Sequence, residues 1–133
     1  TQAGTFVPDP NWDYQGEVEF LEACNMSFRT EALRAIGGFD EAYGGIGDWS
    51  EPDCCFRLRQ QFPQQRLWFS PAASVEHRPS QVGAYVKRRP QSWIRLANYH
   101  RFADQWVKPS LRHTLYRVFL RTYYTGSYYG WWG

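Results

Sequence analysis

The chain has 133 residues, of which 43% are hydrophobic and 21% are charged, and this composition excludes an intrinsically disordered protein. The net charge of +2 is the sum of two unlike halves, because residues 1–76 carry 5 basic and 12 acidic side chains whereas residues 77–133 carry 10 and 1. We expect the two halves either to face different partners or to neutralise each other across an internal interface.

The cysteines and the hydropathy pattern indicate the cellular compartment in which the protein is expected. Cys24, Cys54 and Cys55 favour a reducing compartment, because their number is odd and adjacent cysteines rarely form a disulfide. The sequence contains no secretory signal and no apolar run of about 20 residues, which predicts that nothing spans a bilayer. We therefore expect a cytoplasmic protein, with peripheral attachment at the inner face of the membrane as an option. Because residue 1 is not methionine, we expect it to lie inside a longer chain.

The first half of the chain predicts a strand, a short helix and a loop. Residues 16–24 alternate partly between apolar and polar side chains, which favours a strand. Thr30 is a suitable N-cap for a helix over residues 31–36, and the glycine pair that follows is placed to end it. Residues 43–48 contain three glycines and predict a loop that moves when substrate binds.

The next segment predicts a longer helix followed by two strands. Residues 51–61 have helical periodicity, and Ser50 and Asp53 match the Ser-x-x-Asp capping box. Short runs at 66–70 and 73–77 favour strands separated by a proline.

The last third predicts two helices, over residues 92–106 and 110–124, because apolar side chains recur there at helical spacing. A proline between them ends the first. This order of elements predicts an α/β fold, with short mixed strands, flanking helices and a basic helical tail.

The carboxylates of residues 48–53 are the strongest candidates for chemistry. Asp48, Glu51 and Asp53 gather where a glycine-rich loop meets a helix N-terminus, which stabilises ionised carboxylates. An ionised carboxylate beside an aromatic platform such as Trp49 suits the deprotonation of a sugar hydroxyl. The alternative is that Ser50 and Asp53 merely cap the helix, and spacing alone favours it, although it leaves Glu51 and Trp49 unexplained.

Several motifs in order carry a more specific signal than any one of them. They are Ala23-Cys24-Asn25-Met26-Ser27-Phe28-Arg29, Leu33, Gly37-Gly38-Phe39-Asp40-Glu41, Ser50-Glu51-Pro52-Asp53-Cys54-Cys55-Phe56-Arg57-Leu58, Pro71-Ala72 and Val75-Glu76-His77. Together they resemble the C-terminal half of the family 2 glycosyltransferases, and Asn98-Tyr99-His100-Arg101-Phe102 adds a weaker likeness. The resemblance implies the C-terminal, acceptor-side portion of a GT-A fold.

The resemblance also implies roles for individual residues. Glu51 takes the place of the general base of inverting transfer, in which an acceptor hydroxyl attacks the anomeric carbon of a nucleotide-sugar. Trp49, Ser50 and Asp53 would bind the acceptor, with ordinary packing as the alternative for Trp49 and helix capping for Asp53. The family often has Glu-Asp where this chain has Ser50-Glu51, so the base here would be a glutamate, which reaches further than an aspartate.

Two further residues are implicated in donor and metal binding by the same resemblance. His77 stands where some GT-A enzymes place a ligand for a divalent metal, Mn²⁺ or Mg²⁺; imidazole suits Mn²⁺, whereas Mg²⁺ prefers oxygen. A lone histidine at a strand end is more often structural, and that alternative stays open. Asn25 stands near the donor in the family, and an asparagine that satisfies backbone groups is the alternative.

The sequence lacks the Asp-x-Asp motif with which such enzymes hold their metal. We therefore expect the nucleotide-binding half, and most of the metal site, to lie elsewhere, and this chain alone to be inactive. We predict that residues 1–80 form the acceptor-side catalytic portion and residues 81–133 a basic, aromatic helical extension.

The expected partners follow from this interpretation. They are a nucleotide-sugar donor and a saccharide or lipid-linked acceptor of polysaccharide biosynthesis. Residues 107–133 combine cations with tyrosines and tryptophans, which suits peripheral contact with an anionic membrane leaflet; a helix packed on the body of the enzyme is the alternative. The competing functions are a non-catalytic carbohydrate-binding module, favoured by the 19% aromatic content, and nucleic-acid binding, for which no motif is present.

Overall fold

The structure, a computed structural model, describes residues 13–23, 25–76, 78 and 91–131. Within these residues, four helices and one two-stranded sheet form a small mixed α/β protein.

The chain divides into two compact units. The strand unit takes its described residues from 13–41 and 50–78, and the helical unit takes them from 42–49 and 91–131. This division groups residues 42–49 with the C-terminal helices, and the catalytic portion predicted over residues 1–80 stays a prediction.

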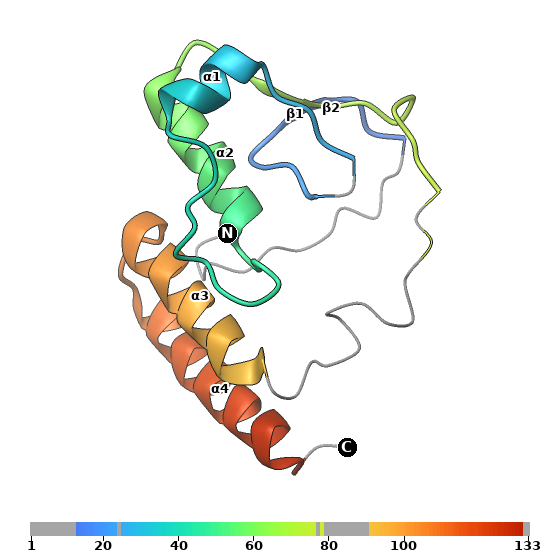
Figure 1. Ribbon diagram of the computed structural model, residues 1–133. Coiled ribbons are helices and arrows are strands. Elements are labelled where there is room, and N and C mark those ends of the chain that lie inside the picture. Colours follow the sequence, from blue (N-terminus) through green and yellow to red (C-terminus); the bar gives the residue numbers. More distant parts are fainter. Residues whose placement is uncertain (1–12, 24, 77, 79–90, 132–133) are drawn as a thin grey trace. The chain divides into compact units, whose positions relative to one another are not determined.

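The strand unit contains a short antiparallel sheet (Figure 1). Strand β1, Gly16–Val18, pairs with β2, Leu67–Phe69, so that Glu17 lies opposite Trp68. The prediction of mixed strands is therefore wrong for the described residues, and the strand predicted over 16–24 ends early.

The strand predicted over 73–77 is absent from its described part, residues 73–76. A strand needs a neighbouring strand to accept and donate its backbone hydrogen bonds. At Ala73 a side chain takes that place, because Nδ2 of Asn25 donates to the Ala73 carbonyl at 2.6 Å.

Helix α1, Thr30–Ala35, lies close to its predicted bounds. The predicted cap is wrong, because Thr30 lies within the helix and the N-cap is Arg29, whose side chain makes no capping hydrogen bond. The predicted end is confirmed, since Gly37 and Gly38 adopt φ of +78° and +77°, a conformation that favours glycine.

Helix α2, Ser50–Gln61, confirms the helix predicted over 51–61. Its first two turns bury Pro52, Asp53, Cys54 and Cys55. Backbone N–H of Leu21 donates to Sγ of Cys55 at 3.3 Å, which connects the segment after β1 to the buried side of α2.

The helical unit consists mainly of helices α3, Ser92–Trp106, and α4, Leu111–Tyr129, which lie side by side in Figure 1. A hydrophobic core forms between them from Leu96, Tyr99, Ala103 and Leu120.

Both ends of α4 have caps. Oγ of Ser110 accepts a hydrogen bond from N–H of His113 at 3.1 Å, and Gly130 ends the helix with a φ of +76°. The helix runs five residues beyond the predicted end at Tyr124, because no residue with a left-handed conformation occurs before Gly130. None of the described helices combines the length and the apolar character that a membrane crossing requires.

Candidate functional site

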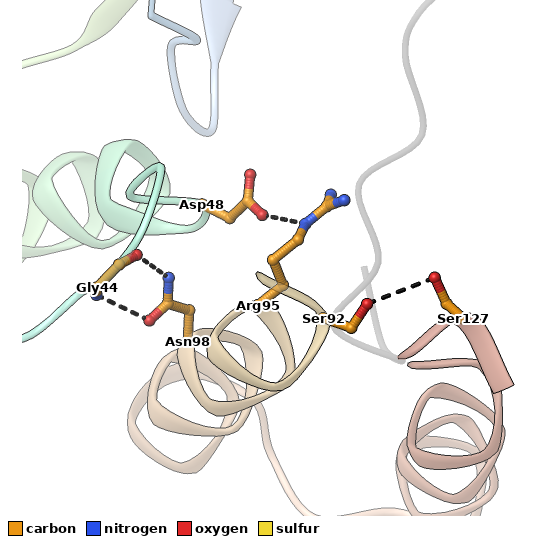
Figure 2. Close-up of polar contacts among 6 residues, drawn as sticks. All are labelled: Gly44, Asp48, Ser92, Arg95, Asn98 and Ser127. Atoms are coloured by element: carbon orange, nitrogen blue, oxygen red, sulfur yellow. Dashed lines mark hydrogen bonds and ion pairs between the residues drawn. The ribbon is translucent and has the colours of Figure 1, made fainter. Parts of the chain in front are cut away.

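The glycine-rich loop that precedes α2 is fastened to α3 (Figure 2). Nδ2 of Asn98 donates to the carbonyl of Gly44 at 2.9 Å, and Oδ1 of Asn98 accepts from N–H of Gly44 at 3.1 Å. Arg95 forms an ion pair with Asp48 at the end of the loop. A Cβ on Gly45 would lie 3.1 Å from Cγ2 of Ile94, and its φ is +65°, so only glycine fits without strain. The loop that we expected to move is thus held at several points.

Trp49 connects this loop to α2 and has a strained backbone. Its φ is +77°, a left-handed conformation that is rare for a residue with a Cβ and costs about 1–3 kcal/mol. The half-buried indole ring packs against Tyr99 and Phe102, at centroid distances of 5.2 and 5.1 Å. This packing holds the strained residue in place. It corresponds to the packing alternative for Trp49, and the stacking of an acceptor sugar on this ring stays a prediction.

Asp53 is engaged with the interior of the strand unit. Its side chain is 1% exposed and accepts a hydrogen bond from Nε of Arg57 at 2.8 Å. The same guanidinium donates to the carbonyl of Ile36 at 2.8 Å, so the pair connects the end of α1 to α2. A carboxylate with so little solvent-exposed surface cannot contact a sugar directly. The arrangement therefore favours a structural role for Asp53.

Replacing Asp53 with asparagine should lower the free energy of unfolding by about 1–3 kcal/mol, because a charge-assisted hydrogen bond to a buried group is weakened. Urea unfolding followed by circular dichroism measures this. Glu76→Gln is the matched control: its ion pair with Arg78 is exposed to solvent and should contribute little to stability. Equal losses in the two variants would contradict the structural role.

Ser50 and Glu51 lie in the first turn of α2 and are partly exposed. Oγ of Ser50 donates to Oε2 of Glu51 at 3.4 Å, a long hydrogen bond. In the described part of the chain, no arginine or lysine forms an ion pair with Glu51. Asp48 and Asp53 each pair with an arginine, so Glu51 is the carboxylate of this segment that stays accessible to a ligand.

The cysteines beside this turn are not candidate nucleophiles. Both Cys54 and Cys55 are fully buried free thiols. Burial raises the pKa of Cys54, and it raises the pKa of Cys55 to about 11. Both thiols are therefore protonated near neutral pH, whereas the thiolate is the reactive form.

The residues implicated in donor and metal binding stay untested. The side-chain amide of Asn25 donates a hydrogen bond to the carbonyl of Ala73. This contact corresponds to the alternative in which Asn25 satisfies a backbone group. His77 lies outside the described residues. Across the ranges that the structure describes, no three His, Cys, Asp or Glu side chains come together as metal ligands would.

A hollow of about 300 Å³ in the strand unit was not expected from the sequence. Trp68 lines it together with Arg29, Arg59 and Arg66, and none of the predicted site residues does. Arg29 ends the first of the family 2 motifs, and nothing in the sequence groups it with Arg59 and Arg66, which lie 30 and 37 residues further along the chain. The segregation of acidic residues to the first half of the chain also draws attention away from them.

Two histidines, the buried His113 and the half-buried His100, make the helical unit sensitive to acid. Burial lowers the pKa of His113, and Arg117 lowers it further, whereas Asp104 acts in the opposite direction. Burial likewise lowers the pKa of His100. Nε2 of His113 and Nδ1 of His100 are buried and have no hydrogen-bond partner among the described residues.

We expect stability to fall as the pH drops below about 6.5, because the unfolded chain, whose histidines keep their ordinary pKa, then binds protons that the folded chain rejects. Above that pH the stability is fully present, and it is lost as the pH falls through the lowered folded-state pKa. His113→Leu should flatten this dependence. Urea midpoints measured between about pH 5 and 8 test it, and an unchanged slope in the variant would show that His113 does not contribute.

Comparison with models of protein families, with curated proteins and with solved structures found no match to this chain.

Proposed function

We propose that this chain is the acceptor-side portion of an inverting glycosyltransferase, with Glu51 as its general base. The observation that carries the proposal is the difference in ion pairing among the three carboxylates of residues 48–53. Arginines neutralise Asp48 and Asp53, whereas Glu51 is partly exposed and has only the Ser50 hydroxyl as a hydrogen-bonding neighbour in the described part of the chain. The ordered family 2 motifs supply the reaction class.

The local structure suits proton removal. Glu51 is in the first turn of α2, where the unsatisfied backbone N–H groups and the helix dipole favour a negative charge. The strained Trp49 comes immediately before this turn and is held by its packing in the helical unit. Strained backbone persists where the surrounding structure over-determines it, and such residues cluster at functional sites.

The proposed reaction moves one proton and one glycosyl group. An oxygen of Glu51 accepts the proton of the acceptor hydroxyl while the hydroxyl oxygen forms a bond to the anomeric carbon. The bond from that carbon to the nucleotide phosphate breaks, its electron pair leaves with the nucleotide, and the anomeric configuration inverts. Ser50 positions the base in this scheme, and Asp53 maintains the fold around it.

The test requires the protein in which this chain is joined to a nucleotide-binding half. A panel of nucleotide-sugars is offered with candidate saccharide and lipid-linked acceptors, and both nucleotide release and glycosylated product are measured. Product formation that is lost in Glu51→Gln supports the proposal. Product of unchanged yield in that variant would remove Glu51 from the reaction.

A second candidate function, sugar binding without catalysis, is favoured by the surface of the hollow. Trp68 lines the hollow and is 57% exposed. Exposed indole rings can act as stacking platforms for sugar rings. A binding module needs no base, so this candidate predicts saccharide affinity that is lost in Trp68→Ala and unchanged in Glu51→Gln. Affinity electrophoresis of both variants separates the two functions.

A further inference from the structure

The outward side of α4 is apolar and exposed over the length of the helix. Leu111, Leu115 and Phe119 are 77%, 61% and 58% exposed. On the opposite side of the same helix, His113 and Leu120 are buried against α3. We define the outer face of α4 as Leu111, Leu115, Val118, Phe119, Tyr123 and Tyr129. At about 100° per residue, these six positions fall within about 140° of the helix circumference.

The stripe is large for a surface that contacts only water. A helix of 19 residues is about 28 Å long, and contiguous exposed apolar stripes of this kind mark interaction sites. The aromatic part of the stripe is ordered by ring contacts, since Phe119 and Tyr123 stack with their centroids 6.1 Å apart. The exposed Tyr123 and Tyr129 carry phenol groups that can still reach water.

The charges around the stripe indicate what covers it. Arg112 and Arg121 are exposed. At about 100° per residue, Arg112 lies between Phe119 and Tyr123 toward one side of the outer face, and Arg121 lies beyond Val118 on the other side. Their long side chains can extend past an apolar boundary. Residues 105–133 contain four basic residues and no aspartate or glutamate. The complementary surface is therefore apolar along its centre and anionic at its edges.

We propose that the outer face of α4 docks on an anionic phospholipid surface, with the helix lying parallel to the membrane plane. Leucine, valine and phenylalanine enter the acyl boundary, tyrosines sit at the headgroup level, and Arg112 and Arg121 contact lipid phosphates. Exposed Trp131, whose ring stacks on Tyr129 at 5.7 Å, extends the aromatic end of the same surface. The inference does not depend on the transferase proposal.

The same charges disfavour two other occupants, a second copy of this chain and a nucleic acid. A second copy of this helix would bring the arginine flanks of two outer faces together with no carboxylate on either helix to compensate, and like charges in contact are destabilising. A nucleic acid would accept the arginines but would leave the leucines and valine of the stripe without a partner. The anionic membrane uses both the cations and the apolar stripe.

The test is co-sedimentation of the 133-residue chain with vesicles of phosphatidylcholine alone and of equimolar phosphatidylcholine and phosphatidylglycerol. We expect binding to the anionic vesicles that weakens with added salt. The double variant Leu115→Ser/Phe119→Ser should bind at least about tenfold more weakly. Arg112→Gln and Arg121→Gln should each lower binding about fivefold. Because all four positions are exposed, the circular dichroism spectra should match the wild type.

Matched controls come from the strand unit. Val75→Ser removes an apolar side chain that is also exposed, and Arg34→Gln removes an exposed arginine, and both should leave binding unchanged. Equal binding to both kinds of vesicle, or no binding to either, would overturn the proposal. So would a dimer in sedimentation equilibrium that dissociates in Leu115→Ser/Phe119→Ser, which would identify a second copy as the occupant. Competition by duplex DNA that is insensitive to the apolar variant would identify a nucleic acid instead.

Discussion

Replacing Glu51 with glutamine should lower the rate of glycosyl transfer by about 10²–10⁴-fold, the usual contribution of a positioned general base. Glutamine keeps the shape of the side chain and its hydrogen bond from Ser50 but cannot accept the proton. The loss should therefore appear in kcat, whereas the KM for the acceptor changes little. Initial rates of product formation in the protein that carries both halves of the enzyme measure it.

Two variants calibrate that result. Glu51→Asp keeps the carboxylate but shortens the side chain by one methylene, so we expect a rate between those of the wild type and the glutamine variant. Glu31→Gln makes the same chemical change in the first turn of α1, at an exposed position, and should leave the rate unchanged. A fall in rate that is equal in Glu31→Gln and Glu51→Gln would show a general effect on the helices and not the loss of a base.

Replacing Tyr99 with alanine should destabilise the helical unit by about 3–5 kcal/mol, the usual cost of deleting a large buried ring. Tyr99 is 0% exposed, and its ring lies 5.2 Å from that of Trp49 and 5.6 Å from that of Tyr116. The deletion leaves a cavity between α3, α4 and the loop that carries Trp49. Such a loss is a large part of the stability of an ordinary domain.

Amide hydrogen exchange locates the effect of this substitution. Protection of α3 and α4 should fall strongly in Tyr99→Ala, since the contacts described for Tyr99 lie within the helical unit. Tyr99→Phe is the matched control and should keep most of the protection, because it preserves the ring. Burial raises the pKa of Tyr99 to about 12, so the hydroxyl is neutral and its removal deletes no charge. Unchanged exchange in the alanine variant would mean that the ring is not part of a packed core.

The helices were largely predictable from the sequence, whereas the strands were not. The apolar spacing of residues 92–106 is a local signal, and local hydrogen bonds along the chain make a helix. The Ser-x-x-Asp pattern marked the start of α2, although Ser50 lies within the helix, its hydroxyl donates to Glu51, and the Asp53 carboxylate accepts from Arg57. A strand is completed by a distant partner. Residues 73–77 have the composition of a strand. At Ala73, however, the backbone carbonyl accepts a hydrogen bond from the side-chain amide of Asn25 and not from a neighbouring strand.

The candidate site was only partly predictable for the same reason. The sequence singled out residues 48–53 as a group of carboxylates with Trp49 among them. It did not indicate that Asp48 pairs with Arg95, 47 residues away, or that Arg57 reaches both Asp53 and the carbonyl of Ile36. These contacts separate the accessible Glu51 from two carboxylates of similar appearance in the sequence.

By itself, the sequence determined the helices, the left-handed turn at Gly37-Gly38 and the accumulation of positive charge toward the C-terminus, because each depends on neighbours a few residues apart. Only the tertiary structure decided which carboxylates are neutralised, that the glycine-rich loop is fastened to α3, and that α4 leaves one apolar side exposed. Burial and charge pairing are contacts between residues far apart in the chain, and they exist only once the chain has folded.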